Sequence, residues 1–257
     1  MHHRFLDTYA DRDGFLQRLD PRVKIASILL FVLSVVFTSP ASYIMLAGYA
    51  VIVFGLVILS QMPLSFILKR SLTVIPFVLM IAIFVPFFKK GRVIGGYSFG
   101  VLKLTLTYNG LMVLWNVLIK SYLSVLALII LTGTTKYTRL LQGLEKLKCP
   151  KIIVMILSFM YRYIFLLEDE LGIMKQAKAS RTVGGSRWFH AKALGNVLGT
   201  LFVRSYERGE AVYLAMCSRG FDGEIRTLDE PPPTVRDFVF LGFIAAVLVG
   251  LRLLSKF

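Results

Sequence analysis

Five long apolar runs leave this sequence few choices of fold. Each run approaches the roughly twenty apolar residues that one helix needs to cross the hydrocarbon core of a membrane. The whole chain is 56% hydrophobic and 18% charged, whereas a soluble domain carries about 25% charged residues. The runs are residues 23–38, 41–59, 72–88, 109–131 and 238–254. The sequence therefore predicts an all-α integral membrane protein with about five transmembrane helices.

Two further segments are apolar but do not fit a membrane crossing. Thr132–Lys148 places leucines at helical spacing against charged residues, which predicts an amphipathic helix lying in the membrane surface. Ile152–Leu167 covers roughly 24 Å as a helix, short of the roughly 30 Å core, and it contains Arg162. We interpret it as interfacial and continuous with the charged helix that follows. Residues 89–107 are rich in Gly and predict a loop with a short ribbon.

The net charge of +15 fits a membrane protein better than a nucleic-acid-binding protein. No basic-aromatic stripe or RNA-binding motif accompanies it, so we expect no nucleic-acid partner. With the N-terminus inside and the C-terminus outside, 23 of the 30 Lys and Arg residues fall in inner segments and six in outer ones. That bias has the sign of the positive-inside rule. Lys120 lies within a predicted span, where a functional role, snorkelling and pairing with a partner subunit stay open.

No Asp or Glu occurs between Asp20 and Glu145. Ion-driven carriers use carboxylates in the membrane to bind the driving ion, and metal-dependent membrane transferases need acidic metal ligands. Walker, His-Glu-x-x-His and Gly-x-Ser-x-Gly motifs are also missing from the sequence. We therefore expect no catalytic residue, no cofactor and no metal site, and an energy supply from another chain. A stand-alone membrane enzyme and a self-sufficient carrier are the alternatives from other classes.

Two long helical patterns within residues 150–220 end alike. The first ends in Ala179, Ser180 and Arg181, and the second in Ser218, Arg219 and Gly220. One Arg near a helix C-terminus is ordinary, because it interacts favourably with the helix dipole. Two such ends suggest guanidinium groups presented to acidic grooves on two copies of one partner. Two ordinary surface helices, the second with a Gly-terminated last turn, are the alternative.

Apolar stripes on the two patterns predict that the helices cross and pack on one another. Pairs of small residues four apart, Gly195 with Gly199 and Ser205 with Gly209, would let another helix approach closely. The predicted packing residues are Tyr161, Phe165, Leu166 and Ile173 on the first helix, and Leu194, Val197, Leu198, Leu201, Phe202, Val212 and Ala215 on the second.

These motifs resemble the transmembrane coupling (T) component of energy-coupling factor (ECF) transporters. The resemblance covers most of the chain, and the Tyr161–Tyr163 and Ala215–Phe221 segments look most like its cobalt branch, the CbiQ-type proteins. Further matching segments are Leu19–Lys24, Glu168–Glu170 and Ala179–Arg181. The first ending departs from the family pattern, because Thr182 stands where Gly is usual.

The resemblance implies a mechanism with several partners. Two cytoplasmic ABC-type ATPase subunits would each bind one helix end, through Arg181 and Arg219. Their closure on ATP would move the crossed helices, and the membrane spans would pass the motion to a CbiM-like substrate-binding membrane subunit. A small accessory membrane subunit can accompany them. Cobalt is the implied cargo, with nickel or a shared vitamin module as the alternatives, in a multi-pass protein of a bacterial or archaeal cell membrane.

Three regions follow from these patterns. Residues 1–132 hold an N-terminal cytoplasmic segment and four spans, residues 133–230 the coupling helices, and residues 231–257 a linker and the last span. Asp20 and Pro21 predict the cap and first position of the first long helix. The N-terminal His2 and His3 receive no metal-binding role, and reduced thiols are expected for Cys149 and Cys217.

Overall fold

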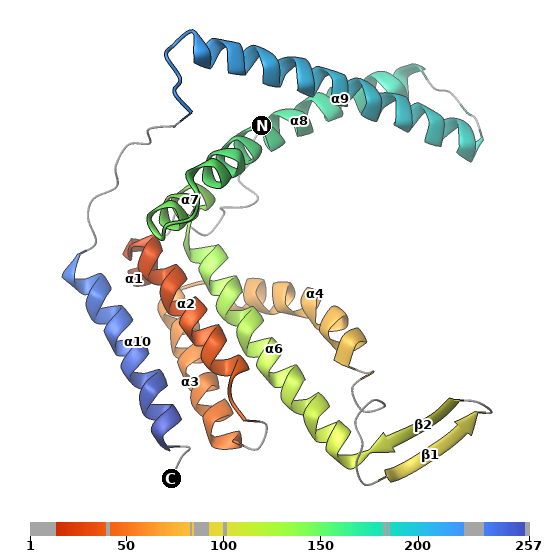
Figure 1. Ribbon diagram of the computed structural model, residues 1–257. Helices are drawn as coiled ribbons and strands as arrows, with labels where there is room; N and C mark the ends of the chain where they lie inside the picture. Colours follow the sequence, from red (N-terminus) through yellow and green to blue (C-terminus); the bar gives the residue numbers. More distant parts are fainter. Residues whose placement is uncertain are drawn as a thin grey trace. The chain divides into compact units, whose positions relative to one another are not determined.

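In the computed structural model, the structure describes residues 14–39, 42–82, 84, 93–99, 102–181, 184, 186–223 and 234–254 (Figure 1). Several residues discussed from the sequence lie outside the described part: His2, His3, Thr182 and residues 231–233 of the linker. The prediction of a helical protein is confirmed. Among the described residues the only strands form one short ribbon.

The chain forms two compact units. One takes in the described residues of His2–Gly143 and Pro232–Phe257, and the other those of Leu144–Pro231. The first unit contains α1 (Phe15–Arg18), α2 (Pro21–Val36), α3 (Tyr43–Ser60), α4 (Leu64–Ala82), β1 (Val93–Phe99), β2 (Leu102–Thr107), α6 (Tyr108–Thr134), most of α7 (Tyr137–Lys146) and α10 (Val235–Leu254).

The start of α2 is fixed by two carboxylates. Asp20 accepts a hydrogen bond from the Arg22 amide at 2.8 Å and Pro21 begins the helix, so the predicted cap is confirmed. Asp237, in the first turn of α10, accepts from the backbone amide of Asp20 at 2.9 Å and from that of Thr234 at 2.7 Å. The buried Asp237 therefore caps α10 and joins it to the beginning of α2.

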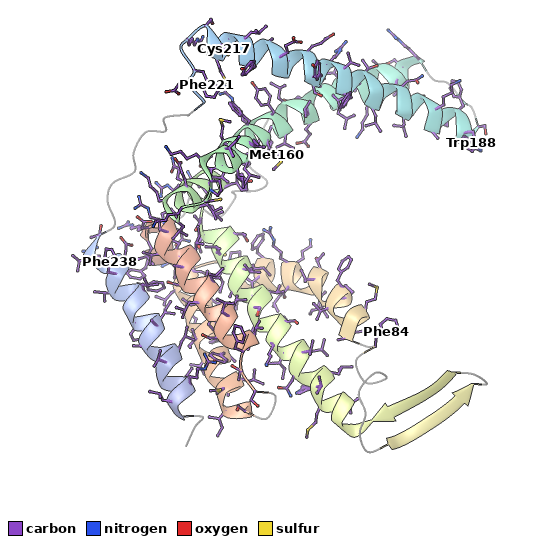
Figure 2. The ribbon with its side chains drawn as sticks, in the orientation of Figure 1. Phe84, Met160, Trp188, Cys217, Phe221 and Phe238 are labelled. Atoms are coloured by element: carbon purple, nitrogen blue, oxygen red, sulfur yellow. The ribbon has the colours of Figure 1, made fainter. Side chains whose placement is uncertain are left out.

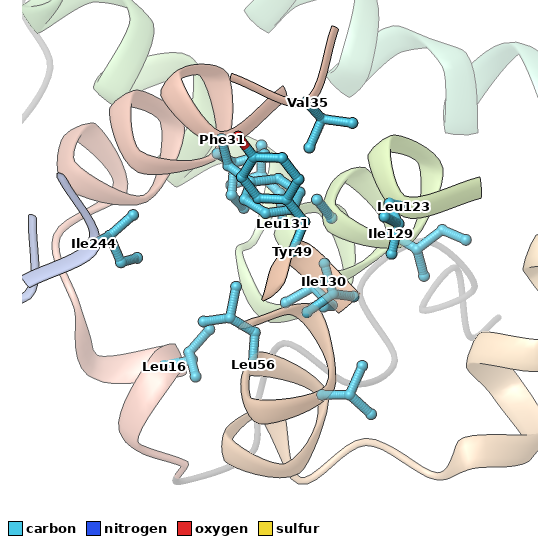
Figure 3. Packing of buried hydrophobic residues seen from close by; sticks show 14 of the residues in the cluster. Leu16, Phe31, Val35, Tyr49, Leu56, Leu123, Ile129, Ile130, Leu131 and Ile244 are labelled. Carbon is cyan, nitrogen blue, oxygen red and sulfur yellow. The ribbon is translucent and has the colours of Figure 1, made fainter. Parts of the chain in front are cut away.

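A single apolar core joins α2, α3, α6 and α10 (Figure 3). Phe31 and Tyr49 pack edge to face in it, with ring centroids 5.8 Å apart, and the Tyr49 hydroxyl lies 3.2 Å from that of Thr38. The opposite faces of these helices carry exposed large apolar side chains, among them Val51, Phe54 and Phe243. Exposed apolar faces around an apolar core are typical of helices surrounded by lipid.

Two lysines join the ends of α2 and α6. Lys24, only 3% exposed near the start of α2, directs Nζ to the carbonyl of Thr134 at the end of α6 (3.4 Å) and to that of Gln17 (3.3 Å). Lys120, in α6, donates to the carbonyls of Val36 and Thr38 at the end of α2. Each cation thus meets backbone carbonyls at the C-terminal end of the other helix, where cations are favoured. This contact is the observed role of Lys120.

Membrane-spanning character is clearest in α6. Gly110–Thr134 is the one described segment both long and apolar enough to cross a bilayer, and Ile44–Ser60 is a shorter apolar helix. All five predicted spans contain a helix, and α4 begins earlier than predicted, at Leu64. The predicted third span continues beyond Ala82 into residues outside the described part. The number of crossings stays a prediction.

The ribbon between α4 and α6 agrees with the prediction from the sequence, whereas the start of α7 differs from it. β1 and β2 pair antiparallel, which confirms the predicted ribbon. α7 begins at Tyr137, and Thr132 belongs to α6, so the predicted start of that helix is wrong. Leu141 is 3% exposed, and a Cβ on Gly143 would lie 3.1 Å from Pro21 and from Ile25. The apolar face of α7 is therefore covered at least in part by α2, a tertiary contact that periodicity does not show.

Candidate functional site: the two helix ends

The second unit consists mainly of two long helices, α8 (Lys151–Arg181) and α9 (Arg187–Cys217). At about 1.5 Å per residue each extends about 46 Å. α8 runs without interruption from its apolar first half into its charged second half, which confirms the predicted continuity. The two helices run in opposite directions and cross (Figure 1).

Contacts at the crossing are partly ionic. Arg204 of α9 forms an ion pair with Glu170 of α8, and Leu166 and Leu201 line the hollow beside it. Nearer the loop, Lys178 Nζ donates to the backbone carbonyl of His190 at 3.2 Å. The two polar contacts lie about two turns apart along α8. They join the helices from the crossing toward the C-terminal end of α8.

Much of the predicted apolar packing is not at the crossing. Leu166 and Leu201 lie there as predicted, but Ile173, Leu198 and Phe202 are 63%, 58% and 72% exposed. Cβ atoms placed on Gly195 and Gly199 would meet nothing within 4 Å. These positions lie between the two polar contacts along the helices, so their exposure places them on faces turned away from the other helix. A periodic stripe marks an apolar face without saying what covers it.

The first helix end lies at the end of α8 and is exposed. Ala179, Ser180 and Arg181 all face solvent. The Ser180 hydroxyl donates to the carbonyl of Gln176 at 3.1 Å, within its own helix. Among the described residues, no hydrogen bond or ion pair involves the Arg181 guanidinium. Gly184, in the segment that follows, has φ +82°.

The second helix end lies at the end of α9 and is closed by a Schellman motif. The Phe221 amide donates to the carbonyl of Met216 at 3.1 Å, and the Gly220 amide to that of Cys217 at 3.0 Å. Gly220 has φ +81°, the left-handed conformation that this motif requires. Figure 2 marks Cys217 and Phe221 at this end of α9, and Trp188 at the other. The glycine after Arg219 therefore has a backbone reason to be there.

Arg219, within the Schellman motif, is exposed. Ser218 donates its hydroxyl to the carbonyl of Ala215 at 3.0 Å, and Ser218, Arg219 and Gly220 are exposed. No described residue forms a hydrogen bond or ion pair with the Arg219 guanidinium. Phe221, which sequence reasoning placed in the motif without a role, completes the cap. The sequence feature that could have predicted this role is the apolar pair Met216 and Phe221, because an apolar contact across the glycine often accompanies a Schellman motif.

The two ends lie on opposite sides of the crossing. From the Glu170–Arg204 pair, Arg181 is about 16 Å further along α8, and Arg219 is about 22 Å further along α9. Because the helices run in opposite directions, these lengths extend away from one another. Considering only the residues that the structure describes, the unit thus presents two unpaired guanidinium groups at well-separated positions, each at the negative end of a helix dipole.

Other chemistry near the ends is limited. A hydrogen bond with Cys217 raises the pKa of the Tyr213 phenol, so this side chain stays neutral near neutral pH. Over the described ranges, no three His, Cys, Asp or Glu side chains lie close enough to share a metal ion.

Comparison with known proteins gives the family. The family model described as cobalt transport protein, CbiQ, matches residues 13–228. An uncharacterised protein of Methanocaldococcus jannaschii is 29% identical over 253 residues, 95% of this chain and 85% of the relative. The energy-coupling factor transporter transmembrane protein EcfT of Limosilactobacillus fermentum is 32% identical over 222 residues, 82% and 81% of the two chains.

A nickel relative matches a shorter segment. The nickel permease LarQ of Lactiplantibacillus plantarum is 33% identical over 90 residues, 35% of this chain and 33% of the relative. The family match extends from α1 through the crossed helices α8 and α9. The family model covers most of the chain, and the chain has the two crossed helices that carry the two Ser-Arg ends. It therefore belongs to the CbiQ family of membrane transport proteins.

Proposed function

We propose that this protein is the non-catalytic coupling subunit of an ECF-type importer. Its two helix ends bind two cytoplasmic ABC-type ATPase subunits, Arg181 in one and Arg219 in the other. Movement of the ATPase pair changes the angle between α8 and α9. The membrane helices transmit that change to a separate substrate-binding membrane subunit.

One observation carries the proposal: each helix ends in an exposed arginine, and the two arginines lie on opposite sides of the crossing. Arg guanidinium suits a planar, bidentate contact with a carboxylate. Two ends about 38 Å apart along the helices suit two sites on a pair of subunits better than one site on a single partner. The Ser hydroxyls at both ends already donate within their helices, so the arginines are left to make the specific contact.

In this proposal the first unit, which contains the predicted spans and is called the membrane unit here, serves as a scaffold. Its polar groups are used internally: Lys24 and Lys120 bind helix carbonyls, and Asp237 caps α10. Because the ATPase subunits would supply the energy, the coupling subunit needs no hydrolytic site. We place its five spans in a bacterial or archaeal cell membrane, with the crossed helices on the cytoplasmic side.

Cobalt is the cargo we propose, on the description of the family model. The nickel permease among the relatives keeps nickel as the alternative. Cargo selection belongs to the substrate-binding subunit, CbiM-like in the cobalt case.

Charge reversal at the two ends tests the proposal. In Arg181→Glu and Arg219→Glu we expect co-purification of the ATPase subunits from native membrane to fall by at least about tenfold, since reversing a buried charge contact costs several kcal/mol. Arg208→Glu is the matched control, because Arg208 is an exposed cation on α9 about 16 Å along the helix from Arg219. It should retain the ATPase subunits.

Three results would contradict the proposal. Retention of the ATPase subunits in both end variants would remove the role of the ends. Turnover by the purified chain alone would favour a membrane enzyme. Uptake by this chain alone in proteoliposomes would favour a self-sufficient carrier.

A further inference from the structure

The first half of α8 has an exposed aliphatic face that no described residue of its own unit covers. Ile152, Ile153, Ile156, Met160 and Ile164, the α8 aliphatic face, are each at least 45% exposed. At about 100° per residue they share one arc of about 120°. Figure 2 marks Met160 in this half of the helix, before the crossing with α9. The same half contains the buried Val154 on a different side.

The charges around this face are all positive. Between Glu145 and Glu168 the chain has no acidic residue, but it has Lys146, Lys148, Lys151 and Arg162. Arg162 and the polar Ser158 are exposed and lie about half a turn round the helix from the aliphatic face. Lys151, Ser158 and Arg162 thus share the side of the helix opposite the aliphatic face. The apolar Val154 and Phe165 lie beside them, and the acidic cluster begins at Glu168.

Aromatic residues mark the far end of the aliphatic face. Phe159 and Tyr163 lie with ring centroids 6.4 Å apart, and Tyr161 packs edge to face on Phe165 at 5.2 Å. Tyrosine is enriched at the boundary between lipid and water, where its ring is in the apolar layer and its hydroxyl in the polar one. Aliphatic residues, tyrosines and cations without acids are the composition of a helix that lies in a membrane surface.

We propose that the α8 aliphatic face lies in the acyl–headgroup boundary of the cytoplasmic leaflet, with the basic residues bound to anionic lipid headgroups. The sign of the charge favours this occupant, because the cytoplasmic leaflet carries anionic lipids that attract Lys and Arg close to the membrane. An acid-free run of this length is suited to a negative surface. The inference goes beyond coupling to the ATPase subunits and makes the bilayer the support on which α8 is held.

Site-directed spin labelling of the full chain in nanodiscs tests the lipid contact. With Cys149 and Cys217 changed to Ser, one label is placed through Ile156→Cys and a matched label through Ser158→Cys, two positions away on the polar side. We expect the Ile156 label to be relaxed several-fold more by oxygen, which concentrates in lipid, than by a water-soluble nickel chelate. The Ser158 label should show the reverse.

Lipid composition tests the role of charge. The oxygen preference at the Ile156 label should be several-fold larger in phosphatidylglycerol-containing nanodiscs than in phosphatidylcholine alone. The double variant Lys148→Asn, Arg162→Gln should remove that difference. Asn is chosen at position 148 because Lys148 has φ +68°, a conformation that Asn tolerates.

Two outcomes would overturn the proposal. One is an Ile156 label that reports water in both lipid mixtures. The other is a label protected only after the substrate-binding subunit is added, which would assign the face to that protein. Circular dichroism of each variant shows whether α8 is still folded. ATPase binding through the helix ends is measured separately, so failure of this proposal would leave the coupling proposal untouched.

Discussion

At the scale of single residues, glycine has its clearest role at position 220. Its φ of +81° is the conformation that costs other L-residues roughly 1–2 kcal/mol, and the Schellman bonds of Met216 and Cys217 depend on it. The same motif closes α7, where the amides of Lys148 and Cys149 donate to Glu145 and Leu144 at 3.1 Å. There Lys148 takes the left-handed position at φ +68°. The chain therefore contains one favourable and one unfavourable version of the same helix end.

Replacing Gly220 by Ala should loosen the second helix end. We expect Gly220→Ala to lower the free energy of unfolding of the second unit, which contains α8 and α9, by about 1 kcal/mol. It should also weaken ATPase binding, because the backbone of Arg219 would no longer be fixed. Gly209→Ala is the matched control, since Gly209 is inside α9 with nothing within 4 Å of an added Cβ; it should stabilise the helix by about 0.5–1 kcal/mol. Thermal unfolding in detergent, followed by circular dichroism, measures both, and equal shifts of the same sign would contradict the explanation.

Lys24, which is buried, and Lys120, which is half-buried, have partners that the sequence does not reveal. Lys24 reads as a flanking charge before the first span, and Lys120 as an isolated charge within another. Their partners lie 110 and 82 residues away in the chain, on helices that become neighbours only when α2 and α6 pack. Asp20 behaves differently: its hydrogen bond to Arg22 is local, so the cap was predictable from three adjacent residues.

At the scale of helices, periodicity identified the elements better than their contacts. The long α8, the ribbon and a helix in each predicted span followed from composition and spacing. The boundary between α6 and α7 did not, because Gly133 lies inside the last turn of α6 and not after its end, where Thr134 and Thr135 contribute to the Lys24 site. The crossing of α8 and α9 was predicted, but the pair Glu170 and Arg204 was not, since charged residues on exposed helices have many possible partners.

The ion pair at the crossing should set how α8 and α9 are held relative to one another. Arg204 is 59% exposed and Glu170 is 25% exposed at the side chain, so the pair contributes about 0.2–1 kcal/mol. We expect Arg204→Glu to widen the distribution of distances between spin labels on the two helices, through repulsion from Glu170. The exchange Glu170→Arg with Arg204→Glu should narrow it again.

A nearby arginine provides the control for that experiment. Arg208 also lines the hollow at the crossing but forms no ion pair with α8 among the described residues, so Arg208→Glu should change the distances less. A broad distribution that the exchange does not narrow would show that apolar contacts at Leu166 and Leu201, and not charge, hold the crossing.

At the scale of the whole molecule, the two units differ in how they use polar and charged side chains. The first satisfies its few buried polar groups internally, with the exception of the buried Gln17 Oε1 and Asn116 Oδ1, which have no partner among the described residues. The second exposes charge along both helices and at both ends. A rigid scaffold joined to a charged pair of helices suits a protein that transmits motion from one partner to another. That division was visible in the sequence as the long acid-free region followed by Glu145, Glu168 and their neighbours.

The two ends should contribute unequally to transport by the complete complex. Arg219 follows a helix end fixed by the bonds of Gly220 and Phe221, whereas the first end lacks the glycine that is usual after its arginine. A guanidinium on a fixed backbone loses less conformational freedom on binding, so its removal forfeits more of the binding energy. We therefore expect Arg219→Ala to reduce cobalt uptake in reconstituted proteoliposomes more than Arg181→Ala, by a factor of about ten per 1.4 kcal/mol of difference. Radioactive cobalt uptake with ATPase and substrate-binding subunits present measures this directly, and a larger loss in Arg181→Ala would show that rigidity of the second end is not what strengthens its contact.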